Sequence, residues 1–479
     1  MTMELLEKIT GWLWGMPLIV TILGTGLYFS FRSNFFQFTH FKHIMENTFG
    51  KLSSKDKGEG GKGVLSPFEA VSTAIGGTVG VGNIGGVATA IASGGPGAVF
   101  WIWVAALFGM IIKMAEVTLA VYYRSKDDEG NPYGGPTYYM EKGLGEERHI
   151  KIWPLIAILF GAGIFSTYFI TMQNYTVSEA VGNTFNIPIL AVSIVYIVFV
   201  YLIISNGIPG LGKIASKIVP FMTMFYLLAG IFIILKNITL LPSGLAEIFK
   251  SAFTGTAAVG GFAGATVSKV MQMGMARSVY SNEAGWGTSP MIHSTARTDH
   301  PVKQGLWGAF EVFVDTILVC SVTALVIVLT GAWKTGESGA TLTLTAFEME
   351  IGSLGRYVIA ISVFLFGLTT TTGWYAYYEI LLRHLMQNKK SIRDKILKFF
   401  RVFYPVPGII IVLIAVFGEM PGTTLWLFAD LTSAIPTFLN VLTILILSPV
   451  FFRLLKDYKS RYLKIGKIDP NSRIFYEED

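Results

Sequence analysis

The stretch TAIGGTVGVGNIGG, residues 73–86, interrupts a segment that is otherwise apolar enough to cross a membrane. Six of its fourteen residues are glycine. Each glycine inside a helix costs about 1 kcal/mol relative to alanine, and in hydrocarbon every freed backbone group needs a partner. We therefore predict a broken helix beside a cavity. The N–H groups of the restarting half, near Val81 to Asn83, would face an anion such as a carboxylate, and the carbonyls near Gly76 to Val79 would face a cation.

Close packing of two helices through small residues is the simpler interpretation of such a stretch. The high density of glycine, together with Thr78 and Asn83 inside the stretch, favours the break instead.

The composition of the whole chain is that of an all-α polytopic membrane protein. Hydrophobic residues make up 52% of its 479 residues, charged residues make up 14%, and the mean hydropathy is +0.55. Apolar runs of about 20 residues recur along it. Cys320 is the single cysteine, which excludes an intrachain disulfide and a cysteine-based metal site. The net charge of +6 comes from basic loops and does not indicate nucleic-acid binding.

We predict eleven transmembrane helices, oriented by the basic residues in their loops. Lys and Arg number 29 in the alternate loops that begin after the first span, and five on the opposite side. The positive-inside rule then places the N-terminus outside and the C-terminus in the cytoplasm of a cell-membrane protein. The expected spans are approximately 12–31, 66–92, 96–122, 152–180, 186–204, 212–236, 260–295, 305–330, 354–382, 402–418 and 424–452.

After the first span, the remaining ten form two sets of five. An odd number of spans per set makes the second set inverted relative to the first. The expected regions are 1–65, an extra N-terminal helix and cytoplasmic loop; 66–237, the first repeat; 260–452, the second, inverted repeat; and 453–479, a cytoplasmic tail.

The second set begins with its own interruption, SNEAGWGTSP at 281–290. Ser289 as N-cap and Pro290 behind it would restart the helix. A proline kink in one long helix is the alternative. Interrupted helices at corresponding positions of two inverted halves indicate the binding site of a transporter.

Several long motifs resemble the alanine or glycine:cation symporter family, also called sodium:alanine symporters. GGPGAVFWIWVAALFG (94–109) follows the family signature, with Ile102 where methionine is usual, and VGVGNIGG (79–86) resembles VGTGNIAG. SNEAGWGTSP resembles SNEAGLGSAP. The resemblance covers approximately residues 66–450. It implies the leucine-transporter fold, five plus five inverted helices with one extra span, and uptake of alanine or glycine coupled to sodium, sometimes to protons.

The resemblance also implies how the substrate is bound. The N–H groups of Val81 and Gly82 would bind its carboxylate, and carbonyls at the two breaks would meet its ammonium. Asn83 would bond the carboxylate or cap the half-helix; the alternative is a packing amide. The expected substrate-binding residues are Thr78, Val81, Gly82, Asn83, Gln173, Ser281, Glu283, Trp286 and Trp374.

A sodium site is expected at the run of threonines at 369–372. The resemblance implies that the hydroxyls of Thr369 and Thr370 complete an oxygen cage with carbonyls, since hard cations prefer oxygen ligands. The carbonyls are those of Gly76, Val79 and Phe366. The alternative is that these threonines bond back to their own helix. We expect Na⁺ as the coupling ion and no resident cofactor.

Two further features qualify this interpretation. Trp286 stands where the family usually has leucine, which would shrink the pocket and tilt its preference toward glycine, unless the ring turns away into helix packing.

Lys113 and Glu116 lie three apart on one helix face, and we expect a structural pair away from the breaks, with a role in ion coupling as the alternative. A structural and a functional role are both open for the other charged residues within spans, and Glu283 is the one expected to matter because it lies within the second break. These residues are Arg277, Glu283, Glu311 and Asp315.

A proton-coupled carrier of the same fold, in which Glu283 or Glu116 replaces sodium, is the main alternative function. An enzyme is not expected, because the six histidines form no His-Glu-x-x-His site and no Gly-x-Ser-x-Gly elbow is present. A channel fits paired broken helices less well than a carrier does. The expected partners are a small amino acid, Na⁺ or H⁺, and the lipid bilayer, with no nucleic acid, around a monomer.

Overall fold

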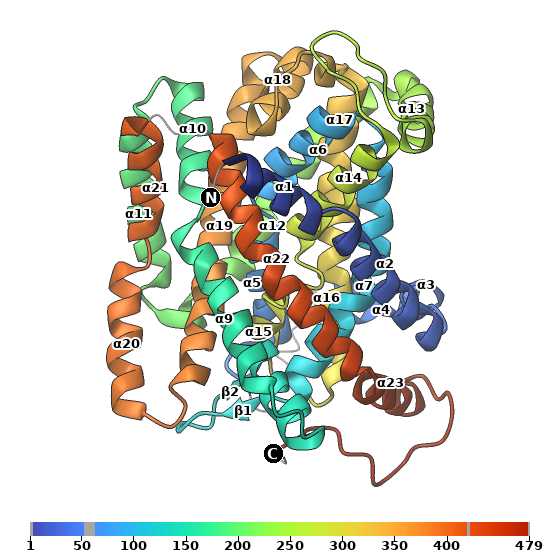
Figure 1. Ribbon diagram of the computed structural model, residues 1–479, viewed down its shortest axis with the longest axis vertical. Coiled ribbons are helices and arrows are strands. Elements are labelled where there is room, and N and C mark those ends of the chain that lie inside the picture. Colours follow the sequence, from blue (N-terminus) through green and yellow to red (C-terminus); the bar gives the residue numbers. More distant parts are fainter. Residues whose placement is uncertain (1–2, 52–62, 419–421, 478–479) are drawn as a thin grey trace.

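The computed structural model describes residues 3–51, 63–418 and 422–477, and it is mostly helical (Figure 1). Within these residues, seven helices are long and apolar enough to cross a membrane, or up to nine when two bent pairs each count as one span. The chain is therefore a multi-pass membrane protein. Part of the predicted first cytoplasmic loop, 52–62, lies outside the described residues.

The first third of the chain carries the first break. Its elements are α1 (Met3–Leu13), α2 (Met16–Ser33), α3 (Phe36–Thr39), α4 (Phe41–Asn47), η1 (Phe49–Lys51), α5 (Pro67–Thr78), η2 (Gly82–Gly86), α6 (Val87–Gly94) and α7 (Ala98–Tyr122). A capping box starts α5: Ser66 Oγ accepts from the N–H of Glu69, and Glu69 Oε2 accepts from the N–H of Ser66. Pro67 follows at the helix start, where its missing N–H costs nothing.

The middle of the chain contains an interruption that we did not predict. Its elements are the antiparallel strands β1 (Ser125–Lys126) and β2 (Pro132–Tyr133), followed by α8 (Pro136–Tyr139), η3 (Met140–Glu147), α9 (Trp153–Phe169), α10 (Gln173–Phe185), α11 (Ile189–Ile204), α12 (Gly207–Lys236), η4 (Ile238–Leu240) and α13 (Leu241–Thr254). The predicted span 152–180 is interrupted at 170–172, between α9 and α10. No glycine or proline marks this point.

The last part of the chain carries the second break. Its elements are α14 (Val267–Asn282), α15 (Ser289–His293), α16 (Pro301–Val312), η5 (Phe313–Cys320), α17 (Ser321–Thr330), η6 (Ala332–Lys334), α18 (Gly339–Ile351), α19 (Ser353–Leu385), α20 (Lys390–Phe403), α21 (Val406–Phe417), α22 (Gly422–Ile446) and α23 (Ser448–Tyr462). The predicted span 424–452 ends early, because the chain bends by 60° between α22 and α23. Helix α23 carries basic side chains in its second half, and the predicted boundary at 453 falls inside this helix.

The two ends of the molecule differ in their elements. Figure 1 shows α13 and α18 at the upper end, and β1, β2, α20 and the C-terminus at the lower end. In the centre, α15 packs against α5, α7 and α19. The interrupted helices are thus surrounded by other helices. In a membrane protein, backbone groups that a break leaves without helical hydrogen bonds are tolerated only when they are buried in protein or line a cavity.

Candidate functional site

The first break lies where the glycine-rich stretch predicts it. Helix α5 ends at Thr78, Val79 is extended with φ −71° and ψ 91°, and the two halves of the span are bent by 46°. A π-helical turn, η2, begins the second half. A Cβ on Gly80 would lie 2.3 Å from Thr370 Oγ1, so only glycine lets α19 approach this closely.

Asn83 holds the first break in shape. Its Oδ1 accepts from the N–H of Gly80 at 2.8 Å, and its Nδ2 donates to Asp315 Oδ1 at 2.7 Å. The side chain is fully buried. Its hydrogen-bonding groups are therefore engaged within the protein and not directed at a substrate carboxylate.

The second break spans the residues between α14 and α15. The backbone of Glu283 is in the left-handed region, with φ 54°, and that of Gly287 has φ 83°. Helix α15 restarts at Ser289, but the expected N-cap bond of Ser289 is absent from the described contacts. Its Oγ instead accepts from Lys113 Nζ at 2.8 Å and donates to Glu311 Oε2 at 3.2 Å. A buried ammonium needs hydrogen-bond acceptors, so the Ser289 hydroxyl binds Lys113 and does not cap the helix.

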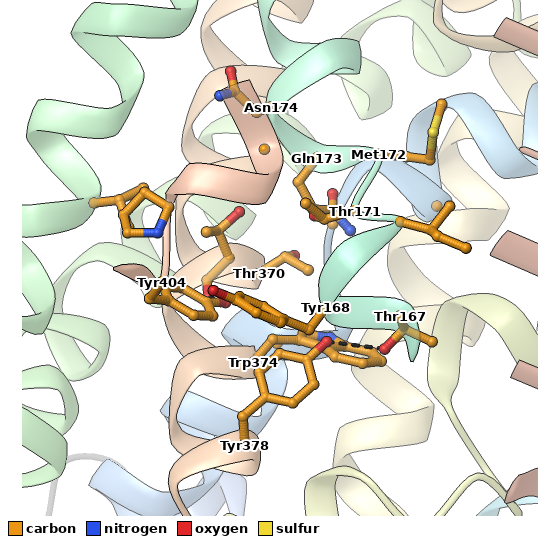
Figure 2. Close-up of a pocket in the computed structure, with 18 of the residues that line it drawn as sticks. Thr167, Tyr168, Thr171, Met172, Gln173, Asn174, Thr370, Trp374, Tyr378 and Tyr404 are labelled. Carbon is orange, nitrogen blue, oxygen red and sulfur yellow. Dashed lines mark hydrogen bonds between the residues drawn. The ribbon is translucent and has the colours of Figure 1, made fainter. Parts of the chain in front are cut away.

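A cavity of about 70 Å³ lies between the two breaks and the α9–α10 interruption. In Figure 2, Trp374 and Tyr378 of α19 form one wall. The wall beside them is formed by Thr167, Tyr168 and the residues from Thr171 to Asn174. Tyr378 and Thr167 join these walls through a hydrogen bond of 2.9 Å between their hydroxyls.

Most of the expected substrate residues line this pocket. Those in its wall are Thr78, Gly82, Gln173, Glu283, Trp286 and Trp374, together with Thr370 of the expected sodium set. Val81, Asn83 and Ser281 are not in the wall, and Ser281 Oγ donates to Asp315 Oδ2 at 2.9 Å. Polar and aromatic lining residues that we did not predict are Thr167, Tyr168, Thr171, Asn174, Tyr196, Tyr280, Thr371, Tyr378 and Tyr404. The four-residue spacing of Trp374 and Tyr378, on one helix face, is the sequence signal for part of this wall.

Glu283 and three aromatic rings form a connected part of the pocket wall. Glu283 Oε1 accepts from Trp374 Nε1 at 3.0 Å, and Oε2 accepts from the hydroxyl of Thr288. The Trp286 ring lies 5.3 Å from that of Trp374 and 5.6 Å from that of Tyr280. Trp286 Nε1 is buried and has no hydrogen-bond partner among the described residues. Trp286 therefore belongs both to the pocket wall and to an aromatic cluster.

Three of the five expected sodium ligands converge. Thr370 Oγ1 lies 3.1 Å from the carbonyl of Gly76 and 3.5 Å from that of Val79. Thr369 instead bonds back to its own helix, at 3.0 Å from the carbonyl of Phe366. The first group is a set of neutral oxygens at the edge of the break, which fits a hard monovalent cation.

Lys113 does not form the expected pair with Glu116 but contacts Glu311 and the backbone of Glu283. Its Nζ donates to the carbonyl of Glu283 at 2.9 Å and lies 3.8 Å from Glu311 Oε1, with both side chains fully buried. Glu116 accepts from the N–H of Gly285 at 3.2 Å and from Asn440 Nδ2. Both residues thus hold the second break, because its freed backbone groups need charged or polar partners.

Two broken helices that meet at a partly polar pocket inside an apolar helical protein define a membrane transporter. The chain belongs to the sodium:alanine symporter family, whose sequence profile matches residues 1–472. Its relatives are transporters, not enzymes, and the family carries out amino-acid:cation symport.

Curated relatives match the chain along nearly its whole length. The sodium/alanine symporter AgcS of Methanococcus maripaludis is 36% identical over 93% of this chain and 95% of its own. The amino-acid carrier protein AlsT of Bacillus subtilis is 35% identical over 95% and 91%. YrbD of Bacillus subtilis, provisionally named a sodium/proton-dependent alanine carrier, is 36% identical over 96% and 92%.

Among solved structures, the fold is similar to that of a manganese transporter of Eremococcus coleocola in complex with an aromatic bis-isothiourea substituted compound. The TM-score is 0.51 at 15% identity, over 87% of this chain and 86% of that one. At this identity the likeness concerns the fold alone.

Proposed function

We propose that this protein couples uptake of a small amino acid, alanine or glycine, to the entry of Na⁺ by alternating access. The observation that carries the proposal is the position of Thr370. Its hydroxyl faces the carbonyls of Gly76 and Val79 at the first break and also lines the pocket. An ion held there would fix the break that binds the substrate, which is a direct physical basis for coupling.

The amino acid would lie between the two breaks. The first N–H groups of a helix have no partner within it, so that of Gly82, which lines the pocket, is suited to a carboxylate. For the ammonium, the carbonyl of Thr78 and the carboxylate of Glu283 are the acceptors at the pocket, since Lys113 already occupies the carbonyl of Glu283.

Trp286 supports a preference for glycine. Its ring fills part of the pocket wall next to Trp374, which leaves less room beside the ammonium site. One methylene in an apolar pocket changes selectivity by about 1–3 kcal/mol, enough to reorder alanine and glycine.

The proposed architecture is eleven transmembrane helices, with two inverted five-helix repeats at 66–237 and 260–452 after an extra first helix. The N-terminus would be extracellular and the C-terminal tail cytoplasmic, in a monomer with no resident cofactor. The 29 to five distribution of basic residues supports this orientation.

Proton coupling is the second candidate. It is favoured by one observation, a carboxylic acid in the pocket wall at Glu283, and by the name of the relative YrbD.

Transport by the purified protein in proteoliposomes tests the proposal. An inward Na⁺ gradient should drive alanine and glycine above their external concentration, and either amino acid should drive Na⁺ entry. Uptake that follows a proton gradient without Na⁺ would instead favour the second candidate. Equilibration without accumulation would contradict both.

A further inference from the structure

A second polar cluster lies behind the pocket, on the far side of Lys113. His293 of α15 places its Nε2 at 2.9 Å from Glu311 Oε2, and its Nδ1 at 2.7 Å from Gln304 Nε2. All three side chains are fully buried. None of them lines the substrate pocket.

This cluster has capacity for one more proton. With the carboxylate of Glu311 as acceptor, His293 Nε2 carries the ring proton, and Nδ1 accepts from the amide of Gln304. Gln304 Oε1 and Glu311 Oε1 are buried and have no hydrogen-bond partner among the described residues. A half-turn of the Gln304 amide would present Oε1 to Nδ1, so that an imidazolium could donate from both nitrogens.

The surrounding charges favour protonation. In the described core around the second break, four carboxyl groups, Glu116, Glu283, Glu311 and Asp315, accompany one ammonium, Lys113. Burying an excess of negative charge is costly, so cations or protons must offset part of it.

The other packed elements add few charges to this cluster. Helix α5 contributes Glu69, which is held in its capping box. Helix α19 contributes the hydroxyl of Tyr377 and the pair of Glu379 with Arg383 at 2.8 Å, and α16 contributes Lys303, paired with Asp299 at 2.9 Å.

Lys113 connects this cluster to the pocket. It lies 3.8 Å from Glu311 and donates to the carbonyl of Glu283, whose side chain lines the pocket. A positive charge on His293 would neutralise Glu311 and repel Lys113. The contact that fixes the second break would then weaken.

We propose that His293, Gln304 and Glu311 form a proton-binding site distinct from the substrate pocket, and that protonation of His293 lowers the affinity of the pocket for its amino acid through Lys113. The second half of this proposal rests on the proposed function.

The test measures the apparent KM for alanine against pH, at constant Na⁺, in proteoliposomes. For the wild type, KM should rise severalfold as the pH is lowered from about 7.5 to about 5.5. His293→Gln keeps a donor toward Glu311 but cannot titrate, so its KM should stay level. His384→Gln is the matched control, because His384 also pairs with a glutamate, Glu141, at 2.7 Å. It should follow the wild type.

Gln304→Met gives an independent measurement, because it removes the acceptor for the second N–H of the imidazolium. The rise in KM should therefore move to lower pH, because the charged form of His293 loses a hydrogen bond. The proposal is overturned if the KM of His293→Gln depends on pH as that of the wild type does. It is also overturned if the pH dependence of KM disappears in His384→Gln as it does in His293→Gln. If His293→Gln is not monodisperse, an unmoved profile in Gln304→Met overturns it.

If the wild type shows no alanine uptake, the proposed function fails, but the proton site remains testable. The thermal unfolding midpoint of the substrate-free protein is then compared with that of Gln304→Met across the same pH range. A difference that grows as pH falls supports the site, and parallel curves overturn it.

Discussion

At the scale of single residues, Thr369 and Thr370 show how neighbours of one type take different roles. Thr370 faces the carbonyls of the first break, whereas Thr369 bonds to its own helix and to Met222 Sδ at 3.3 Å. The two lie about 100° apart around the helix, so only one of them can point at the break.

This difference predicts unequal effects of removing the hydroxyls. Thr370→Val preserves shape but removes one proposed sodium ligand, so the apparent Na⁺ affinity should fall about tenfold or more, equivalent to about 1.4 kcal/mol. Thr369→Val is the matched control and should change it less than about twofold. Alanine uptake measured against Na⁺ concentration checks this. Equal effects of both changes would contradict the assignment of Thr370.

Trp286 gives a second prediction at this scale. Trp286→Leu removes a ring from the pocket wall, so alanine should gain relative to glycine by about tenfold. Competition of labelled glycine uptake by unlabelled glycine, L-alanine, D-alanine and serine measures the change. Reduced expression with an unchanged order of competitors would place Trp286 in helix packing alone.

At the scale of elements, the two breaks could be predicted because glycine and proline carry a local backbone signal. Residues 76–86 and 281–290 cannot form a continuous helix cheaply. The interruption at 170–172 has no such signal, although its residues line the pocket. The partner of Lys113 could not be predicted either, since Glu311 lies almost 200 residues away and only the packing of α7 on α16 brings them together.

The start of α16 carries a prediction about acid stability. His300 is its N-cap: Nδ1 accepts from the N–H of Val302 at 3.1 Å, and Nε2 donates to Asp457 Oδ2 at 3.2 Å. Burial lowers the pKa of His300 to about 4, while hydrogen bonding to Asp457 and its negative charge oppose this shift. The folded protein thus favours neutral His300. Its contribution to stability is present above about pH 6.5 and is lost as pH falls toward 4.

Replacing His300 by Asn keeps a capping oxygen but removes this titration. The loss of stability between pH 7.5 and 5 should shrink by about 2 kcal/mol. Thermal unfolding of the detergent-solubilised protein at both pH values measures it. An equal fall of Tm in the variant and the wild type would show that His300 does not contribute.

At the scale of the whole molecule, the proposed alternating access requires the helices around the pocket to separate on one side at a time. Arg277 and Asp430 join α14, which contributes Tyr280 to the pocket wall, to α22, on the side of the second break that leads to α13. The guanidinium contacts the carboxylate at 2.7 and 3.1 Å, and both side chains are mostly buried. Opening the pocket toward the α13 end would pull α14 from α22 and break this bidentate pair.

We therefore expect this pair to stabilise the closed form on that side. Asp430→Asn removes the negative charge that faces a mostly buried guanidinium, which is costly, so uptake should fall by about tenfold or more. The reversed pair, Arg277→Asp with Asp430→Arg, can re-form the contact and should recover part of the loss. Arg356 and Glu348, paired at 2.8 Å with side chains 31% and 41% exposed, form the matched control, and their reversal should leave uptake unchanged because exposed pairs contribute little. If the reversed pair transports no better than Asp430→Asn while both are equally well folded, the role of the Arg277–Asp430 contact in closing the pocket is wrong.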